Sequence, residues 1–198
     1  MKLTTNTALV TCFLLTTISC TKENTISHSS EMANSTGKTV SFTIGQHYGG
    51  GIIFYIDSTG EHGLIADTAD LRPSKWWNGV YTVTGATATR IGSGHGNTRK
   101  IVLSQGDSAS LYAARRCWRY KGSGYKDWFL PSRDELNALY KQKDVVGGFV
   151  PGDAYYWSSS ETSIDHVYMQ RFGDGAIFSI EKYYSVNPAN FVRAIRAF

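Results

Sequence analysis

The sequence has few cysteines, and their positions leave none to pair. Of the three cysteines in 198 residues, Cys12 and Cys20 lie near the N-terminus and only Cys117 lies beyond residue 20. An intrachain disulfide within residues 21–198 is therefore excluded, and a domain there must be stabilised by a packed core. Cys117 lies in an Ala- and Arg-rich segment that favours a helix, where a lone cysteine is typical of a small buried hydrophobic residue.

The sequence also lacks motifs of metal, cofactor or catalytic chemistry. None of the five histidines shows the HExxH spacing or another paired spacing for a metal, and no Glu-Pro-Asn or Trp-Asn-Asp calcium motif occurs. The Gly-Ser-Gly-His-Gly run at residues 92–96 lacks the Gly-Lys-Ser/Thr ending of a phosphate loop, so we predict an ordinary loop. We therefore expect no cofactor, no metal and no enzymatic activity.

A long hydrophobic run is missing as well. The apolar stretch at residues 8–18 reaches about half of the roughly 20 residues that a membrane-spanning helix needs. With Lys2 before it and the small Ser19 after it, this stretch is typical of a secretory signal peptide covering residues 1–19. The Thr-Ile-Ser-Cys segment at 17–20 resembles a lipobox, which predicts a lipid on Cys20. The alternative is an ordinary signal peptide cut near Ser19, because Thr17 replaces the usual leucine.

Residues 20–39 are polar and lack an apolar period, which indicates a flexible tether between the lipidated Cys20 and one domain over residues 40–198. Lys22 and Glu23 resemble the charged export tags of surface lipoproteins. We therefore expect an outer membrane lipoprotein at the cell surface, with the periplasmic face as the alternative. The membrane is contacted through the lipid anchor only, and an exported chain with a net charge of +4 is not expected to bind nucleic acid.

Local patterns predict an α+β domain with two helices and mainly antiparallel strands. Helices are expected at residues 108–120 and after Ser132, where Glu135 completes a capping box. Between residues 76 and 98 we expect loops with short strands. Arg193 and Arg196 face opposite sides of the last strand, and one of them should pair with a carboxylate inside the fold. The expected strands cover residues 52–56, 63–66, 155–157, 166–172, 176–180 and 191–198.

Several ordered blocks carry a family resemblance, and they lie at residues 48–55, 63–66, 124–132, 135–136, 156–161 and 192–198. Together they resemble the Lcl C-terminal domain family, which is named from a collagen-like bacterial adhesin. The resemblance implies a C-type-lectin-like fold and extracellular ligand binding, in some members of sulfated glycans. Enzymes that share this fold use a pair of cysteines, and only Cys117 is present here.

A narrower set, which we call the frame residues, comprises residues 157–161 (Trp-Ser-Ser-Ser-Glu), Gln170, Phe172, Gly175, Lys182 and residues 192–198. This set is similar to that of variable proteins of diversity-generating retroelements, in which Asn codons between constant positions are randomised at adenines. An Asn codon ending in a pyrimidine cannot become Lys, Glu, Gln, Met or Trp. Between residues 162 and 191 these types occur only at Met169, Gln170, Glu181 and Lys182. Met169 and Glu181 depart from the pattern, and the alternative is a non-variable relative with the same scaffold.

The region after Trp157 has the composition of a paratope, in which Tyr gives contact area and Ser and Asn give adaptable hydrogen bonds. It predicts a surface for a protein or glycan ligand outside the cell. On the strand at 166–172, His166, Tyr168, Gln170 and Phe172 share one side. The predicted ligand-binding residues are Thr162, Ser163, Asp165, His166, Tyr168, Arg171, Asp174, Phe178, Tyr183, Tyr184, Asn187 and Asn190.

Two alternatives remain open. An adhesin for anionic, sulfated glycans would use the basic residues Arg115, Arg116, Arg119 and Lys121, with Lys126 nearby. A polysaccharide hydrolase would need an unrecognised carboxylate pair such as Asp127 and Asp134.

We predict that Cys20→Ala releases the protein from the membrane, because the acyl chains on that thiol supply the anchor. Fractionation of membrane and soluble material, with labelling by a fatty-acid analogue, measures this directly. Unchanged membrane association of the variant would exclude lipidation at Cys20.

Overall fold

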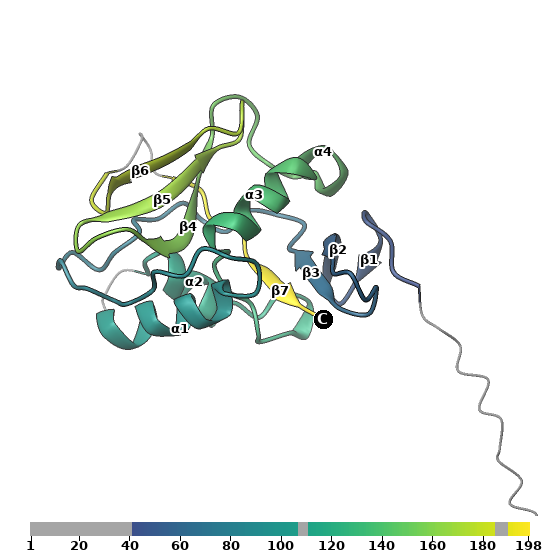
Figure 1. Cartoon of the computed structure of the whole chain (residues 1–198), viewed down its shortest axis with the longest axis horizontal. Helices are drawn as coiled ribbons and strands as arrows, with labels where there is room; N and C mark the ends of the chain where they lie inside the picture. The colour runs from purple at the N-terminus through teal and green to yellow at the C-terminus, as the bar shows by residue number, and fades with distance from the viewer. Residues whose placement is uncertain (1–40, 107–110, 185–189) are drawn as a thin grey trace, which may run out of the picture. The chain divides into compact units, whose positions relative to one another are not determined.

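The computed structural model describes residues 41–106, 111–184 and 190–198 (Figure 1). The α+β class is confirmed: these residues form four α-helices and two antiparallel sheets, although only two helices were expected. The helices are α1 (Gly94–Gln105), α2 (Ala113–Arg119), α3 (Arg133–Lys141) and α4 (Lys143–Val146), with a 3₁₀ turn at Gly122–Gly124. The strands are β1 (His47–Tyr48), β2 (Gly51–Ile56), β3 (Gly63–Ala66), β4 (Tyr155–Glu161), β5 (His166–Arg171), β6 (Ile177–Glu181) and β7 (Ile195–Ala197).

The two sheets have the strand orders β1-β2-β3-β7 and β4-β5-β6. Both predicted hairpins, β2-β3 and β5-β6, are confirmed, and each follows from turn residues between two apolar runs. The strand predicted at 191–198 is shorter than expected. Phe191 and Val192 make only isolated bridges, and the strand covers Ile195–Ala197.

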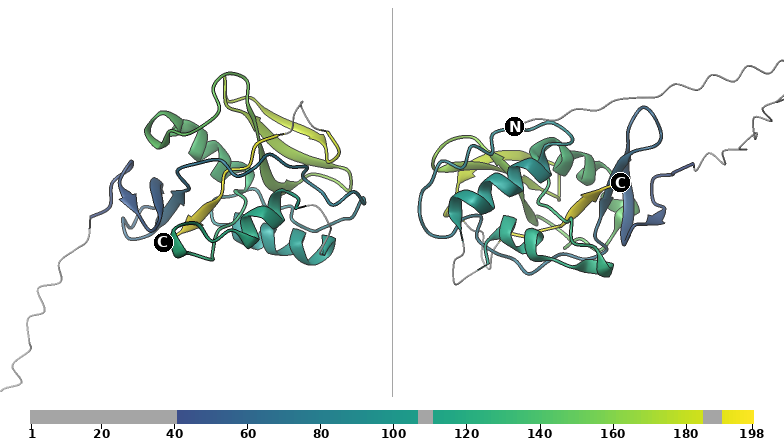
Figure 2. Two further views of the ribbon diagram at one scale, coloured as in Figure 1. Left: turned by 180° about the vertical axis from the view of Figure 1, so that it is seen from behind. Right: turned by 90° about the horizontal axis from the view of Figure 1, so that it is seen from below.

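Helix α3 and the C-terminal segment connect the two sheets. Helix α3 contacts β4 and β5 of one sheet and β2 of the other, and it lies between them in Figure 1. The C-terminal segment forms bridges from Val192 to Leu71, from Ile195 to Phe129 and from Phe191 to Tyr156. Helices α1 and α2 pack side by side, and α1 also contacts β4 (Figure 2). The three-stranded sheet is thus held against the rest of the domain by several elements.

Both C-terminal arginines are paired, where only one was expected to be. Arg193 is 1% exposed; its Nε donates to Asp70 at 2.7 Å, and its guanidinium lies 3.9 Å from the centre of the Phe149 ring. Arg196 donates to Asp127 at 2.7 and 2.9 Å. A buried guanidinium without such partners would be costly, so each pair anchors the C-terminal segment in place.

The capping box of α3 is confirmed, and its glutamate also accepts a hydrogen bond from the segment before α1. Glu135 accepts a hydrogen bond from Ser132 N at 2.7 Å and another from Gly92 N at 2.8 Å, just before α1. Gly94 N approaches the same carboxylate at 3.4 Å, and a Cβ on Gly94 would come within 2.2 Å of it. The buried carboxylate therefore occupies the N-terminus of α1 and requires glycine there. Burial raises the pKa of Glu135.

Helix α1 was not predicted, and two expectations about this region were wrong. Residues 94–96 of the Gly-Ser-Gly-His-Gly run form the first turn of α1 instead of a loop, and residues 76–93 contain no strand. The two glycines lower the helix propensity of the segment, and its N-cap Ser93 makes no side-chain capping bond. The capping group is Glu135, which lies about 40 residues away in the sequence.

Helix α2 covers Ala113–Arg119, inside the predicted 108–120; residues 107–110 lie outside the described range. Cys117 is fully buried as expected, and burial raises the pKa of its thiol. Trp118, on the same helix, is 38% exposed. None of the helices in the described part of the chain has the length and apolar character to span a membrane.

Candidate functional site

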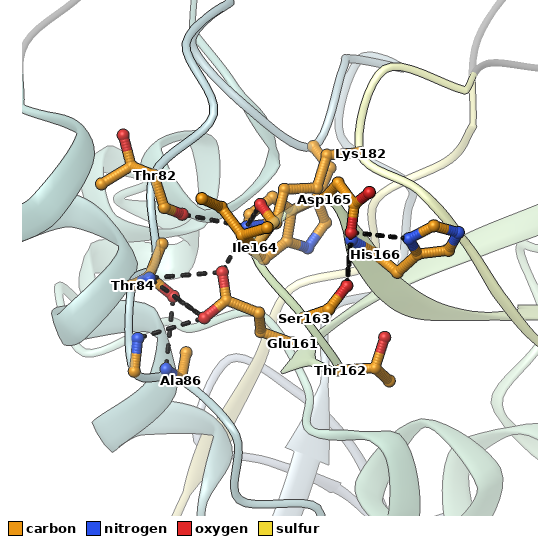
Figure 3. Close-up of polar contacts among 12 residues, drawn as sticks. Thr82, Thr84, Ala86, Glu161, Thr162, Ser163, Ile164, Asp165, His166 and Lys182 are labelled. Carbon is orange, nitrogen blue, oxygen red and sulfur yellow. Dashed lines mark hydrogen bonds and ion pairs between the residues drawn. The ribbon is translucent and has the colours of Figure 1, made fainter.

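A buried ion pair lies where β4 ends and β6 ends. The Lys182 ammonium donates to the Glu161 carboxylate, and both side chains are 1% exposed (Figure 3). The ammonium also lies 5.1 Å from the centre of the buried Trp76 ring. Because an unpaired charge at this depth would be strongly unfavourable, the pair fixes the two strand ends to each other.

The ion pair also forms hydrogen bonds with the backbone of two loops. Lys182 Nζ donates to the carbonyl oxygens of Thr82, at 2.9 Å, and Ile164, at 2.6 Å. Glu161 accepts from the backbone N–H groups of Thr84 and Gly85 at 3.0 to 3.2 Å. Segments 82–85, 161–164 and 182 therefore meet around one pair of charges, as Figure 3 shows.

The exposed and half-buried side chains on the segments around this pair form what we call the loop surface. Its exposed or half-buried members are Tyr81, Val83, Thr162, Ser163, Ile164, Asp165, His166, Glu181, Tyr183 and Tyr184. Tyr81 stacks on Trp77 with ring centres 4.5 Å apart, and Thr162 Oγ1 lies 2.9 Å from Ser179 Oγ. Tyr81 and Val83 were missed in the sequence. Their loop reaches this place through backbone hydrogen bonds to Lys182 and Glu161, which lie far away in the sequence.

Ser163, Asp165 and His166 form a polar cluster on the loop surface (Figure 3). The Asp165 carboxylate accepts from Ser163 Oγ at 2.6 Å and from His166 Nδ1 at 2.9 Å, and these bonds lower its pKa to about 2. The three residue types match those of a serine hydrolase, but the serine donates to the aspartate and not to the imidazole. Without a base at the hydroxyl, the geometry organises a turn and does not activate a nucleophile.

Strand β5 is covered on both sides, so the predicted sheet surface is smaller than expected. Val167 and Met169 pack into the core on one side, whereas Gln170 on the other donates to Asn137 of α3 at 3.0 Å. Tyr168 is half-buried beneath Arg133, whose guanidinium lies 5.2 Å from the ring centre. Exposed residues of this sheet therefore lie at its two turns, at Ile177 and Ser179 of β6, and after β6.

The other predicted ligand-binding residues do not join the loop surface. Arg171 and Asp174 pair with each other at the β5-β6 turn, which is the opposite end of β5, and the Arg171 guanidinium lies 5.6 Å from the centre of the half-buried Phe178 ring. Asn190 is 1% exposed and its amide lies 3.5 Å from Met169 Sδ, so it lies inside the fold. Asn187 lies outside the described residues.

The predicted basic residues line two adjoining hollows along α2. One, of about 540 Å³, is lined by Arg115, Trp118, Arg119, Tyr120, Lys121 and Lys126. The other, of about 290 Å³, is lined by Leu71, Arg72, Leu111, Arg116, Arg119 and Tyr120. We call the two together the basic cleft. Burial, followed by the charge of Arg119, lowers the pKa of Arg115; burial and the charge of Arg72 do the same for Arg116.

The two carboxylates considered for a hydrolase are each bound to an arginine. Asp127 accepts from Arg196, which lowers its pKa, and Asp134 accepts from Arg133 at 2.8 Å. A general acid needs a raised pKa, so this arrangement gives no support to the hydrolase alternative. Within the described part of the chain, no three His, Cys, Asp or Glu side chains gather as they would to hold a metal ion.

A scan of the chain against protein-family models finds no match, and a search of curated proteins finds none either. The family resemblance therefore rests on the residues that carry it.

We predict that Glu161→Gln and Lys182→Met each lower the free energy of unfolding by about 3–5 kcal/mol, because each leaves a buried partner uncompensated. The double variant should lose much less than the sum of the two single losses. Urea unfolding followed by tryptophan fluorescence measures all three. Asp174→Asn, in an exposed pair, is the control and should leave stability nearly unchanged. A single-variant loss below about 1 kcal/mol would show that the pair does not hold the loops.

Proposed function

We propose that the chain is an extracytoplasmic, lipid-anchored binding protein whose loop surface recognises a ligand outside the cell. Anchorage at the outer membrane follows from the signal peptide and the lipobox-like segment. The loop surface supplies aromatic, hydroxyl and carboxylate groups on turns that a buried ion pair holds in place. Such a combination suits recognition better than turnover, since no nucleophile on it is activated.

One observation carries this proposal: the frame residues are buried except Gly175, Ala197 and Phe198, and exposed residues lie between them. Trp157, Phe172 and all three serines of segment 158–160 are at most 3% exposed, and Gln170 and Lys182 are each 1% exposed. By contrast, Thr162, Ser163, Tyr183 and Tyr184 are exposed. A scaffold whose packing residues are separate from its surface residues can change its ligand without losing its fold.

The α+β architecture and the covered three-stranded sheet support assignment to the C-type-lectin-like folds. Within that fold we propose that the region between Glu161 and Val192 is diversified by a retroelement. Met169, which departs from the expected codon pattern, is only 3% exposed and packs in the core. A residue buried in this way does not limit which side chains the loop surface presents. Glu181 is the other residue that departs from the expected codon pattern.

Deep sequencing of the locus across a cultured population tests the diversification. We expect changes confined to adenine-templated codons between Glu161 and Val192, with an invariant near-copy in the flanking DNA. Changes should fall on exposed positions such as Thr162, Ser163 and Tyr183, and the buried frame residues should stay constant. A uniform locus without a near-copy would contradict diversification and leave a binding protein of fixed specificity.

A second candidate function, adhesion to anionic glycans, is favoured by one feature of the basic cleft. Arg116 Nε is buried and finds no hydrogen-bond partner among the described residues, and Arg116 and Arg119 line the same hollow. Cations crowded in this way repel one another, so a bound sulfate or carboxylate would relieve the repulsion and fill the missing hydrogen bond. Trp118 and Tyr120 add aromatic surface against which a sugar ring can pack.

For this candidate we expect a heparin-derived oligosaccharide to bind the protein and its desulfated form to bind much more weakly. Arg116→Gln should lower the affinity about tenfold, as one charge-assisted hydrogen bond is lost. Raising the salt concentration should weaken binding steeply. Titration calorimetry measures these affinities, with Lys141→Gln on α3 as the matched control. Equal affinity for the desulfated sugar would rule the candidate out.

A further inference from the structure

The loop surface exposes an unusual amount of apolar and aromatic side chain. Large patches of this kind on a folded domain mark sites of interaction with other molecules. Tyr81 and Val83 come from the loop before α1, and the others from the turns at each end of the ion pair. The exposed fractions are 42% for Tyr81, 62% for Val83, 51% for Ile164, 55% for Tyr183 and 40% for Tyr184.

Two carboxylates lie among these side chains. Glu181 is the β-bridge partner of His166, next to Asp165. Tyr183 hydrogen bonds to Glu181, which raises the pKa of that tyrosine. Burial raises the pKa of Tyr81, and the negative charges of Glu181 and Asp165 raise it further. Tyr81 therefore lies near both carboxylates, and Tyr183 lies near Glu181. A cation at this place would meet an aromatic ring and a carboxylate together.

The nearby cations do not cancel this negative charge. Lys182 is neutralised by Glu161 beneath the surface, and Arg133 is paired with Asp134 above Tyr168. His166 shares its Nδ1 with Asp165, and the second carboxylate, Glu181, has a tyrosine hydroxyl as its partner. Lys100 donates to Gly85 O at 2.9 Å beside the loop of Tyr81, so the negative charge of Asp165 and Glu181 is local to the surroundings of Tyr81 and Tyr183.

We propose that the loop surface binds a basic segment of a protein ligand, with an Arg or Lys side chain against Tyr81 and Tyr183 and its charge near Asp165 and Glu181. This inference rests on the proposed function and names the class of its ligand. Arginine fits best, because its planar guanidinium stacks on aromatic rings and donates two parallel hydrogen bonds to a carboxylate.

The same features disfavour other occupants. An anionic ligand would be repelled by Asp165 and Glu181. A neutral sugar would take water from both carboxylates without supplying a countercharge. In addition, Glu181 cannot arise from an adenine-mutated Asn codon, whereas Asp165 and Tyr183 can.

The test uses the mature full-length protein in detergent and three fluorescent peptides of alternating glycine with arginine, citrulline or glutamate. Citrulline has nearly the shape of arginine without its charge, which makes it the matched control. Fluorescence anisotropy gives the affinities. It is measured at about 50 mM salt, where the Debye length exceeds ~10 Å and charges are screened only weakly. We expect the arginine peptide to bind at least roughly tenfold more tightly than the other two.

Variants locate the binding. Asp165→Asn combined with Glu181→Gln should weaken the arginine peptide about tenfold, and Tyr81→Ser combined with Tyr183→Ser should do the same. Glu61→Gln combined with Asp144→Asn removes two exposed carboxylates elsewhere and should change nothing. Thermal unfolding midpoints equal to that of the wild type confirm that the variants fold, since none of these residues contributes a side chain to the Glu161–Lys182 pair.

The outcomes separate the ligand class from the proposed function. If the citrulline or glutamate peptide binds more tightly than the arginine peptide, the ligand is not basic. Loss of that binding in the Tyr81→Ser, Tyr183→Ser variant would still identify the loop surface as the binding site. Equal binding of the arginine peptide by every variant, or no binding by wild type, would overturn the inference. Sedimentation tests whether the protein associates with itself as its concentration rises. If it does, and Asp165→Asn with Glu181→Gln abolishes the association, the ligand of the loop surface is the basic cleft of a second copy and the proposed basic peptide segment is overturned.

Discussion

The arrangement of this domain depends on two opposite charges that are buried together. Glu161 and Lys182 are separated by 20 residues, and each needs the other to remain charged away from water. Between them they bind backbone groups of four further residues, which are Thr82, Thr84, Gly85 and Ile164. Alternative packings that separate the charges are heavily penalised, so the pair selects one arrangement of these loops even if it adds little net stability.

A consequence of this construction is that the surface above the pair carries little of the packing energy. The ion pair binds Thr82 and Ile164 through their carbonyl oxygens, and any residue type at those positions offers the same oxygen. Side chains on the loop surface are therefore nearly independent of the scaffold. The basic cleft differs in this respect, because Cys117 on the same helix faces the core and constrains how α2 can change.

The sequence was informative where a structure depends on neighbouring residues. The capping box at Ser132 and Glu135 and the hairpin at 173–175 have their signals within a few positions, and both were predicted. Helix α1 was not, because its capping carboxylate comes from α3. For the same reason composition pointed to Thr162 and Tyr183, which are exposed on the loop surface, but not to Tyr81. Its place there depends on a hydrogen bond between residues 100 positions apart.

The burial of Cys117 bears on how the protein matures. It is the only thiol beyond Cys20, it is inaccessible in the folded domain, and burial raises its pKa. The domain therefore reaches its native state by packing alone and requires neither a thiol oxidase nor a disulfide isomerase. Once folded, copies of the protein cannot become cross-linked through this residue. The yield of active protein should then be the same in aerobic and anaerobic cells.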